Sequence, residues 1–116
     1  MTNLLSQKKC KPCEGETKAF DRAAAEEYLK QTPGWQLTPD YKRICREYVT
    51  KNFMEAVRFI NKTAEIAESE NHHPDISLRE YRRLKIELST HAISGLSEND
   101  FIVAAKLNEL PVEVKK

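Results

Sequence analysis

The sequence has little of what marks secreted or membrane-spanning proteins. No apolar run approaches the roughly 18 to 20 residues that a helix needs to cross a bilayer. The start, MTNLLSQKKC, has no long apolar stretch after its charges, so it does not resemble a secretory leader. These absences predict a cytoplasmic protein. A chain of 116 residues is most economically one domain, which is long enough to bury a core.

Charge of one sign is not in excess. Nineteen Lys and Arg residues stand against eighteen Asp and Glu residues, a formal net charge of +1. This balance offers no electrostatic footprint for nucleic acid or an anionic membrane, so we expect direct binding to neither. A local basic set consists of Arg79, Arg82, Arg83 and Lys85. Its simplest interpretation is a solvated hairpin surface, and binding of an anion or a partner is the alternative.

Cysteine is scarce, and its odd count argues against a complete internal disulfide framework. The chain has Cys10, Cys13 and Cys45, which fits a reducing compartment. Cys10 and Cys13 have the C-x-x-C spacing of a zinc half-site or a redox pair, but no second C-x-x-C and no finger-type histidine pair follows. We therefore expect an exposed tail there, with metal or redox chemistry as the less favoured alternative.

Composition divides the chain into three parts. Residues 1–19 are rich in Lys, Glu, Gly and Thr and have few large apolar groups, so they predict a flexible N-terminal tail. Residues 20–110 carry the periodic patterns of a folded domain, and residues 111–116 are expected to form a C-terminal tail.

The first half of the predicted domain has the pattern of a helix followed by a strand pair. Asp21 has the side chain of an N-cap, and apolar residues recur at helical spacing after it until Thr32. Residues 35–50 contain aromatic and β-branched residues interrupted by a turn signal at Pro39 and Asp40. They predict two antiparallel strands.

The second half repeats this order with a longer helix. From Phe53 to Ala67, apolar residues recur at intervals of three and four, which predicts an amphipathic helix that Pro74 should stop. Alternation between residues 76 and 88 predicts a second hairpin that turns at residues 81–83. Ser97, with an acidic residue three places later, begins a last helix.

This order of elements predicts the fold class. A helix and a hairpin, then a second helix and hairpin, then a third helix indicate an α+β domain in the order α-β-β-α-β-β-α. We expect a four-stranded antiparallel sheet with three helices packed on one face.

The histidines carry the chemical signal. The chain has three, His72, His73 and His91. Glu68 lies four residues before His72, so both would share one face of the long helix, and a carboxylate beside an imidazole fixes its orientation. A hairpin that follows directly on His73 would bring His91 back towards the helix end. We therefore predict that the three rings converge on one cleft and act in general acid–base catalysis.

Other interpretations of these residues stay open. The histidine pair could simply be polar residues that end a helix, and a three-histidine metal site is less favoured because the H-E-x-x-H spacing is absent. Asp100 fits a helix cap better than a direct chemical role. Trp35 more often packs in a core than it stacks on a flat heterocycle.

The spacing of these residues resembles the signature of the pterin-4a-carbinolamine dehydratase family. That signature combines an acidic or polar residue, a His-His-Pro run, an aromatic residue, a histidine and an aspartate. These places are occupied here by Glu68, His72, His73, Pro74, Tyr81, His91 and Asp100. Gly34, Trp35 and the run from Leu88 to Asp100 add to the resemblance, which covers about residues 21–110. The CKPCEG stretch before it resembles N-terminal extensions of bacterial members.

The resemblance implies dehydration of 4a-hydroxytetrahydrobiopterin, the pterin-4a-carbinolamine, to quinonoid dihydropterin and water. No metal and no cofactor is implied, since the pterin is the substrate. It also implies roles for individual residues. His72, His73 and His91 would be catalytic, Glu68 and Asp100 supporting, and Trp35, His73, Pro74, Ser89 and Thr90 substrate-binding.

The resemblance further implies partners. The reaction recycles the cofactor of an aromatic amino acid hydroxylase, so a functional link to such an enzyme is expected. Exposed sheet edges and the family both predict a homodimer or a homotetramer. A non-catalytic dimerisation or transcriptional regulatory module is the alternative, because animal members of the family also act as dimerisation cofactors of a homeodomain transcription factor.

Overall fold

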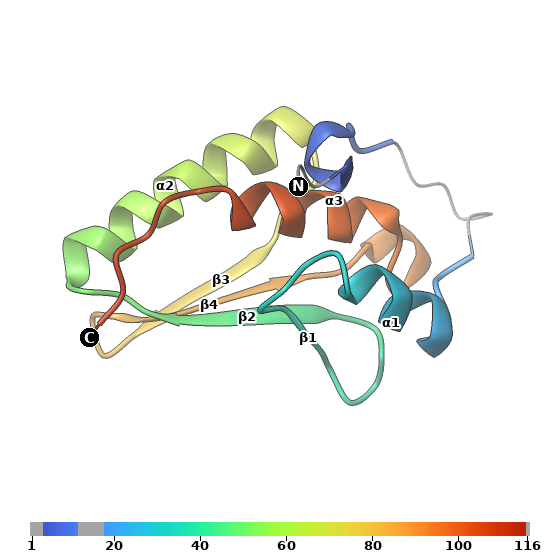
Figure 1. Ribbon diagram of the computed structural model, residues 1–116, viewed down its shortest axis with the longest axis horizontal. Helices are drawn as coiled ribbons and strands as arrows, with labels where there is room; N and C mark the ends of the chain where they lie inside the picture. Colours follow the sequence, from blue (N-terminus) through green and yellow to red (C-terminus); the bar gives the residue numbers. More distant parts are fainter. Residues whose placement is uncertain (1–3, 12–17, 116) are drawn as a thin grey trace.

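The structure, a computed structural model, describes residues 4–11 and 18–115 (Figure 1). The described residues form the α-helices α1 (Arg22–Leu29), α2 (Phe53–Glu70) and α3 (Glu98–Asn108) and the short 3-10 helices η1 (Leu4–Gln7) and η2 (His91–Ile93). The strands are β1 (Gln36–Leu37), β2 (Ile44–Val49), β3 (Asp75–Arg79) and β4 (Arg83–Leu88). The predicted order of helices and hairpins and the α+β class are confirmed.

The four strands form one antiparallel sheet in the order β1-β2-β4-β3. The two central strands pair from Ile44 opposite Leu88 to Val49 opposite Arg83. Figure 1 shows α2 and α3 over one face of the sheet, while α1 contacts β1 and α3. The predicted packing of the helices on one face is therefore confirmed, and β3 is left as an edge strand.

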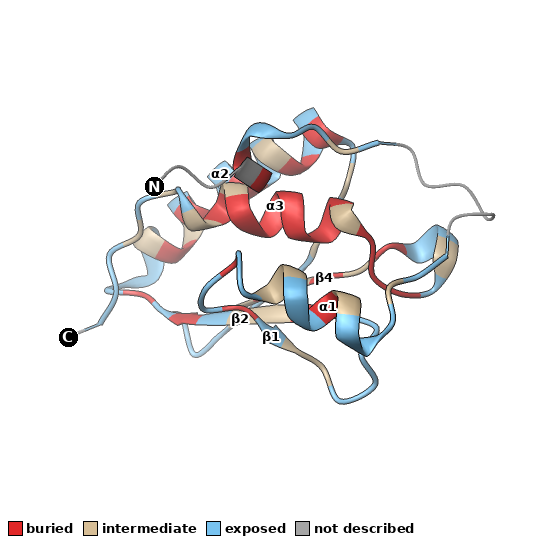
Figure 2. Cartoon of the chain, turned by 45° about the vertical axis from the view of Figure 1, so that its right-hand side comes forward, coloured by how far each residue is buried: buried red, intermediate tan, exposed pale blue. Residues whose placement is uncertain are grey.

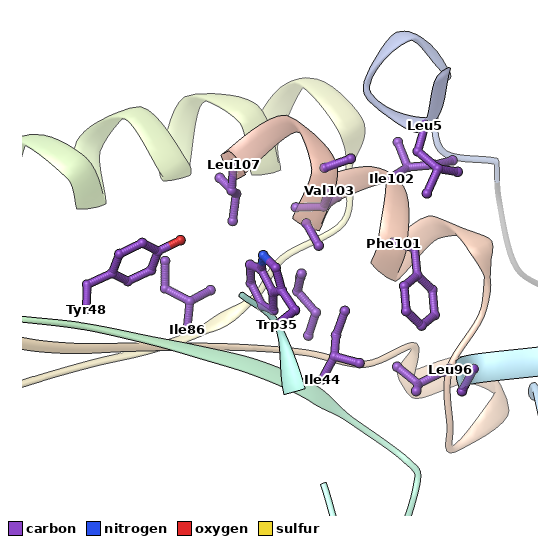
Figure 3. Close-up of a cluster of buried hydrophobic side chains, with 14 of the residues drawn as sticks. Leu5, Trp35, Ile44, Tyr48, Ile86, Leu96, Phe101, Ile102, Val103 and Leu107 are labelled. Atoms are coloured by element: carbon purple, nitrogen blue, oxygen red, sulfur yellow. The ribbon is translucent and has the colours of Figure 1, made fainter. Parts of the chain in front are cut away.

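The core lies between the sheet and α3. Along β4 the side chains of Leu84, Ile86 and Leu88 are buried while their neighbours are more exposed, as the alternation predicts. α3 is buried over most of its surface (Figure 2), and Figure 3 shows Phe101 and Leu107 of this helix among the core side chains. Each such fully buried apolar side chain contributes about 1.5–3 kcal/mol to stability. No helix among the described residues is long and apolar enough to span a membrane.

The long helix ends before the histidine pair and not at Pro74, so this part of the prediction is wrong. α2 ends at Glu70, and Asn71 has a left-handed backbone with φ of 51°. The amide of His72 then donates to the carbonyl oxygen of Ala67 at 3.1 Å, which closes the helix end. Asn tolerates this backbone better than most residues, because its short polar side chain can hydrogen-bond locally. Both histidines therefore lie in the segment between α2 and β3.

The N-terminal residues 4–11 pack against α3, although the sequence predicts a flexible tail. Leu5 in η1 is only 2 % exposed and belongs to the core. The Ser6 hydroxyl donates to Glu109 Oε2 at 2.6 Å, and Lys8 Nζ lies 3.0 Å from Glu98 Oε2. One apolar side chain that meets an apolar surface, together with these polar contacts, orders the segment. The rest of that predicted tail lies mostly outside the described residues.

The C-terminal residues also contact the sheet, although the sequence predicts a tail from residue 111. Val114 forms an isolated bridge with Thr50. The amide of Lys51 donates to Glu113 O at 2.9 Å, and the amide of Lys115 donates to Val49 O at 2.8 Å. These backbone hydrogen bonds attach residues 113–115 beside the end of β2.

Candidate active site

An open cavity of about 690 Å³ lies where the end of α2 meets the neighbouring ends of β3 and β4. The antiparallel pairing places Asp75 at the start of β3 opposite Glu87 near the end of β4. The segment before β3 and the segment after β4 therefore run side by side. His72 and His73 come from the first segment and His91 from the second, and all three line this cavity as the sequence predicts.

His72 is held by a buried carboxylate from α3. Its Nε2 lies 2.6 Å from Asp100 Oδ1, and the exposed fractions of the two side chains are 12 % and 0 %. The other carboxylate oxygen, Oδ2, accepts hydrogen bonds from the Thr90 hydroxyl at 2.8 Å and the Ser97 amide at 3.0 Å. Asp100 thus completes the predicted capping box of α3 and also orients His72. Three polar partners satisfy a charge that would be costly to bury alone.

Glu68 contacts His73 and not His72, contrary to the spacing argument. That argument assumes a helix through both residues, but α2 has already ended at Glu70. Glu68 Oε2 is hydrogen-bonded to His73 Nε2, and both side chains are exposed. The two histidines therefore have different environments, one enclosed and one open to solvent.

His91 has a third kind of environment. It begins η2 directly after Thr90, is exposed, and its ring makes no hydrogen bond with any described residue. Pro74, Ser89 and Thr90, all expected to bind substrate, line the same cavity. A second hollow of about 350 Å³, lined in part by Lys42 and Arg43, shares Ser89, Thr90 and His91 with the first.

The structure does not bring Trp35 to this cavity. Its side chain lies in the core (Figure 3), is 4 % exposed, and donates from Nε1 to Asn108 Oδ1 at 3.0 Å. Gly34 before it has φ of 89°, a backbone that turns the chain so that the indole faces α3. Within the described chain Trp35 packs, which is the commoner use of a tryptophan.

The predicted alternative of a metal or redox site at the cysteine pair has no structural support in the described residues. Cys13 lies outside them. Burial first, and then the carboxylate of Glu70, raise the pKa of the Cys10 thiol to about 12, so the thiol is neutral at pH 7. The described residues contain no group of three or more His, Cys, Asp or Glu side chains placed to hold a metal ion.

Several residues that line the cavity were not among the predicted site residues, and four of them connect it to the N-terminal segment. Cys10 and Lys11 line the cavity, and so do Glu70 and Asn99, which bind the N-terminal segment. Burial acts to raise the pKa of the Glu70 carboxyl, but the Cys10 amide and the Lys106 ammonium outweigh it, and the pKa lies below its ordinary value of 4.5. The apolar residues at positions 4 and 5 are the only signal that could have indicated a docked segment.

The basic hairpin set lies on a surface of mixed charge. Arg83 Nε lies 2.5 Å from Glu80 Oε2, and Lys85 Nζ lies 3.4 Å from Glu87 Oε2. The Arg82 guanidinium lies 4.8 Å from the centre of the Tyr81 ring. These contacts fit the interpretation of a solvated hairpin surface.

Comparison with known proteins agrees on one family. The family model described as Pterin 4 alpha carbinolamine dehydratase matches residues 18–110. A protein of Halorhodospira halophila, provisionally named a pterin-4-alpha-carbinolamine dehydratase, is 45 % identical over 106 residues, which cover 91 % of this chain and 96 % of that protein. The Arabidopsis thaliana protein named pterin-4-alpha-carbinolamine dehydratase 2, mitochondrial, is 46 % identical over 112 residues, which cover 94 % of this chain and 60 % of that protein.

One solved structure resembles this chain both in fold and in sequence. The crystal structure of a transcriptional coactivator/pterin dehydratase from Brucella melitensis matches with a TM-score of 0.73 and 31 % identity. The match covers 78 % of this chain and 96 % of that chain. With the family model spanning most of the sequence and both sequence relatives above 40 % identity, the chain belongs to the pterin 4 alpha carbinolamine dehydratase family.

Proposed function

We propose that this protein dehydrates a 4a-hydroxytetrahydropterin to a quinonoid dihydropterin and water, and so recycles the cofactor of an aromatic amino acid hydroxylase. One observation carries the proposal: His72, His73 and His91 line one cavity, and buried Asp100 orients His72. Membership of the family and the printed names of its relatives support the same substrate class.

The reaction is an elimination that changes no overall oxidation state. The C4a–O bond breaks after the hydroxyl has taken a proton from a general acid, and it leaves as water. The N5–H proton passes to a general base, and the electron pair of that bond forms the C4a=N5 double bond. One proton is supplied and one is removed, which suits two imidazoles near neutral pH.

His72 and His91 are the proposed proton-transfer groups. Because Asp100 holds Nε2 of His72, the ring nitrogen Nδ1 of His72 is left for exchange with the substrate. His91 is exposed and has no ring hydrogen bond among the described residues, so its ring nitrogens are open to the substrate. His73, paired with Glu68, orients or stabilises the pterin, and Pro74, Ser89 and Thr90 complete the binding surface.

The proposed steps require no metal ion and no organic cofactor, because imidazoles supply and accept both protons. Dialysis against EDTA should therefore leave the rate of dehydration unchanged. Stoichiometric bound zinc whose removal abolishes activity would contradict this part of the proposal.

Stopped-flow absorbance tests the proposal directly. Decay of chemically made 4a-hydroxytetrahydropterin is followed with wild-type protein and with His72→Ala, His73→Ala and His91→Ala, after subtraction of the unaided reaction. We expect acceleration by the wild type and loss in the variants, with Lys62→Ala on the exposed side of α2 as a control that keeps full activity. No acceleration by a folded wild type would refute the dehydratase.

A regulatory role is the second candidate, because the Brucella melitensis neighbour is described as both a coactivator and a pterin dehydratase. Such a role would use a surface away from the histidines, so it would survive His91→Ala. We also propose a homo-oligomer, for which the edge strand β3 with Ile76 at 37 % exposure offers an unpaired edge within the described chain. Light scattering after size-exclusion chromatography measures that state.

The cytoplasmic location stays a prediction. The Arabidopsis thaliana relative is named mitochondrial, so membership of the family does not by itself imply the cytoplasm.

A further inference from the structure

We propose that the N-terminal segment, Leu4–Lys11, forms one wall of the pterin cavity and that Asn99 is a positioning residue that holds this wall. The inference rests on the proposed function for the identity of the ligand. Cys10 and Lys11 line the same cavity of about 690 Å³ as the three histidines. The segment comes from the far end of the sequence, and no catalytic position of the family signature falls in it.

Asn99 binds the backbone of Lys11 at both of its polar groups. The Lys11 amide donates to Asn99 Oδ1 at 3.0 Å, and Asn99 Nδ2 donates to Lys11 O at 2.6 Å. Asn99 is only 7 % exposed, so water competes poorly for these hydrogen bonds. A side-chain amide that makes one hydrogen bond as donor and one as acceptor to the same backbone residue mimics a strand partner and fixes that residue in place.

Glu70 holds the residue before it. The Cys10 amide donates to Glu70 Oε1 at 2.8 Å, and Glu70 Oε2 lies 3.6 Å from Lys106 Nζ, with the Glu70 side chain 4 % exposed. The Cys10 thiol lies 3.6 Å from Asn99 O. The two residues of the segment that meet the cavity are thus held by the last turn of α2 and the first turn of α3.

The contacts of Asn99 and Glu70 act at a different part of the segment from those of Leu5 and Ser6. Leu5 and Ser6 already bind the other end of it to α3, through the core and through Glu109. The buried polar contacts of Asn99 and Glu70 instead act where the segment borders the cavity. Because the Cys10 thiol is neutral at pH 7, the charge of this wall comes from Lys11, while Cys10 adds a weakly polar sulfur that can pack against a flat heterocycle.

Steady-state kinetics with 4a-hydroxytetrahydropterin test the wall. Asn99→Leu removes both hydrogen bonds to Lys11 and should raise KM roughly tenfold while kcat stays within about twofold. Asn99→Asp keeps an acceptor for the Lys11 amide and should give an intermediate KM. Asn61→Leu, the same change at an exposed site of α2, is the matched control and should leave both constants at wild type.

A binding measurement on the wild type alone does not depend on enzyme activity or on whether a variant folds. Hydrogen exchange of the Cys10 and Lys11 amides in the wild type should slow on addition of 7,8-dihydrobiopterin, the stable tautomer of the product. Unchanged KM in folded Asn99→Leu, or no slowing at these amides when the pterin binds, would refute the proposed wall but not the proposed function. A wild type that neither accelerates the reaction nor binds 7,8-dihydrobiopterin would overturn the proposed function, and the wall with it.

Discussion

Replacement of Asp100 by Asn tests whether one buried carboxylate controls proton transfer at His72. Asp100 Oδ2 accepts from the Thr90 hydroxyl and the Ser97 amide, while Oδ1 lies 2.6 Å from His72 Nε2. Asn keeps the shape but has one oxygen, which is best placed towards the two donors. Its amide hydrogens would then face His72, and the ring would have to accept at Nε2 and carry its proton on Nδ1. Proton transfer at Nδ1 needs either the opposite tautomer, in which Nδ1 is free to accept, or a ring protonated at both nitrogens, which amide hydrogens facing Nε2 disfavour.

The structure separates the expected effects on activity and on stability. We expect kcat to fall about 10²- to 10⁴-fold, the share that a positioned general acid or base supplies. The free energy of unfolding should fall by only about 1–2 kcal/mol, because one charge-assisted hydrogen bond becomes a neutral one while the contacts of the remaining oxygen persist.

Stopped-flow rates and urea unfolding curves, measured on the same preparations, check both numbers. Asp21→Asn is the matched control, since Asn caps a helix about as well as Asp and α1 lies away from the cavity residues. A kcat of Asp100→Asn within about threefold of wild type, less than 1 kcal/mol in barrier height, would refute the proposed role of the carboxylate in orienting His72.

Three further substitutions test the surroundings of the site. Thr90→Val removes the hydroxyl that donates to Asp100 at 2.8 Å and should lower the free energy of unfolding by about 1–3 kcal/mol in urea titrations; an unchanged midpoint would contradict this. The lowered pKa of Glu70 means that its charged form stabilises the fold above pH 4.5, so wild type should be more stable than Glu70→Gln at pH 7 and the two should converge as the pH falls through the folded pKa. A difference in unfolding free energy that stays constant as the pH falls from 7 into the acid range would argue that the charged form of Glu70 does not stabilise the fold. Asn71→Ala should cost about 1–2 kcal/mol in thermal unfolding, because Ala keeps the Cβ that strains the left-handed backbone but lacks the polar side chain that offsets this strain; Asn71→Gly should not, and equal losses would exclude this cause.

Local patterns predicted the elements well, since each depends on neighbours in sequence. The alternation of Leu84, Ile86 and Leu88 indicates a half-buried strand wherever the strand is placed. Ser97 and Asp100 likewise form a helix cap that involves only four consecutive residues. The order of such elements was enough to predict the sheet and its layer of helices.

The same local logic failed at the end of α2. A helical spacing pairs Glu68 with His72, but the left-handed turn at Asn71 removes His72 from the helix and directs it to α3. Whether a helix ends four residues before a proline depends on one residue's backbone energy and on which residues the following side chains can contact. Sequence spacing contains neither quantity.

The sequence by itself therefore determined the identity and order of the elements and the set of histidines, because periodicity, caps and residue chemistry are local properties. Only the tertiary structure decided which carboxylate meets which histidine, that Trp35 packs in the core, and that Leu5 docks its segment beside the cavity. Each of these outcomes depends on burial against residues far away in the chain. Such burial needs two surfaces from distant parts of the chain, and no short stretch of sequence contains both of them.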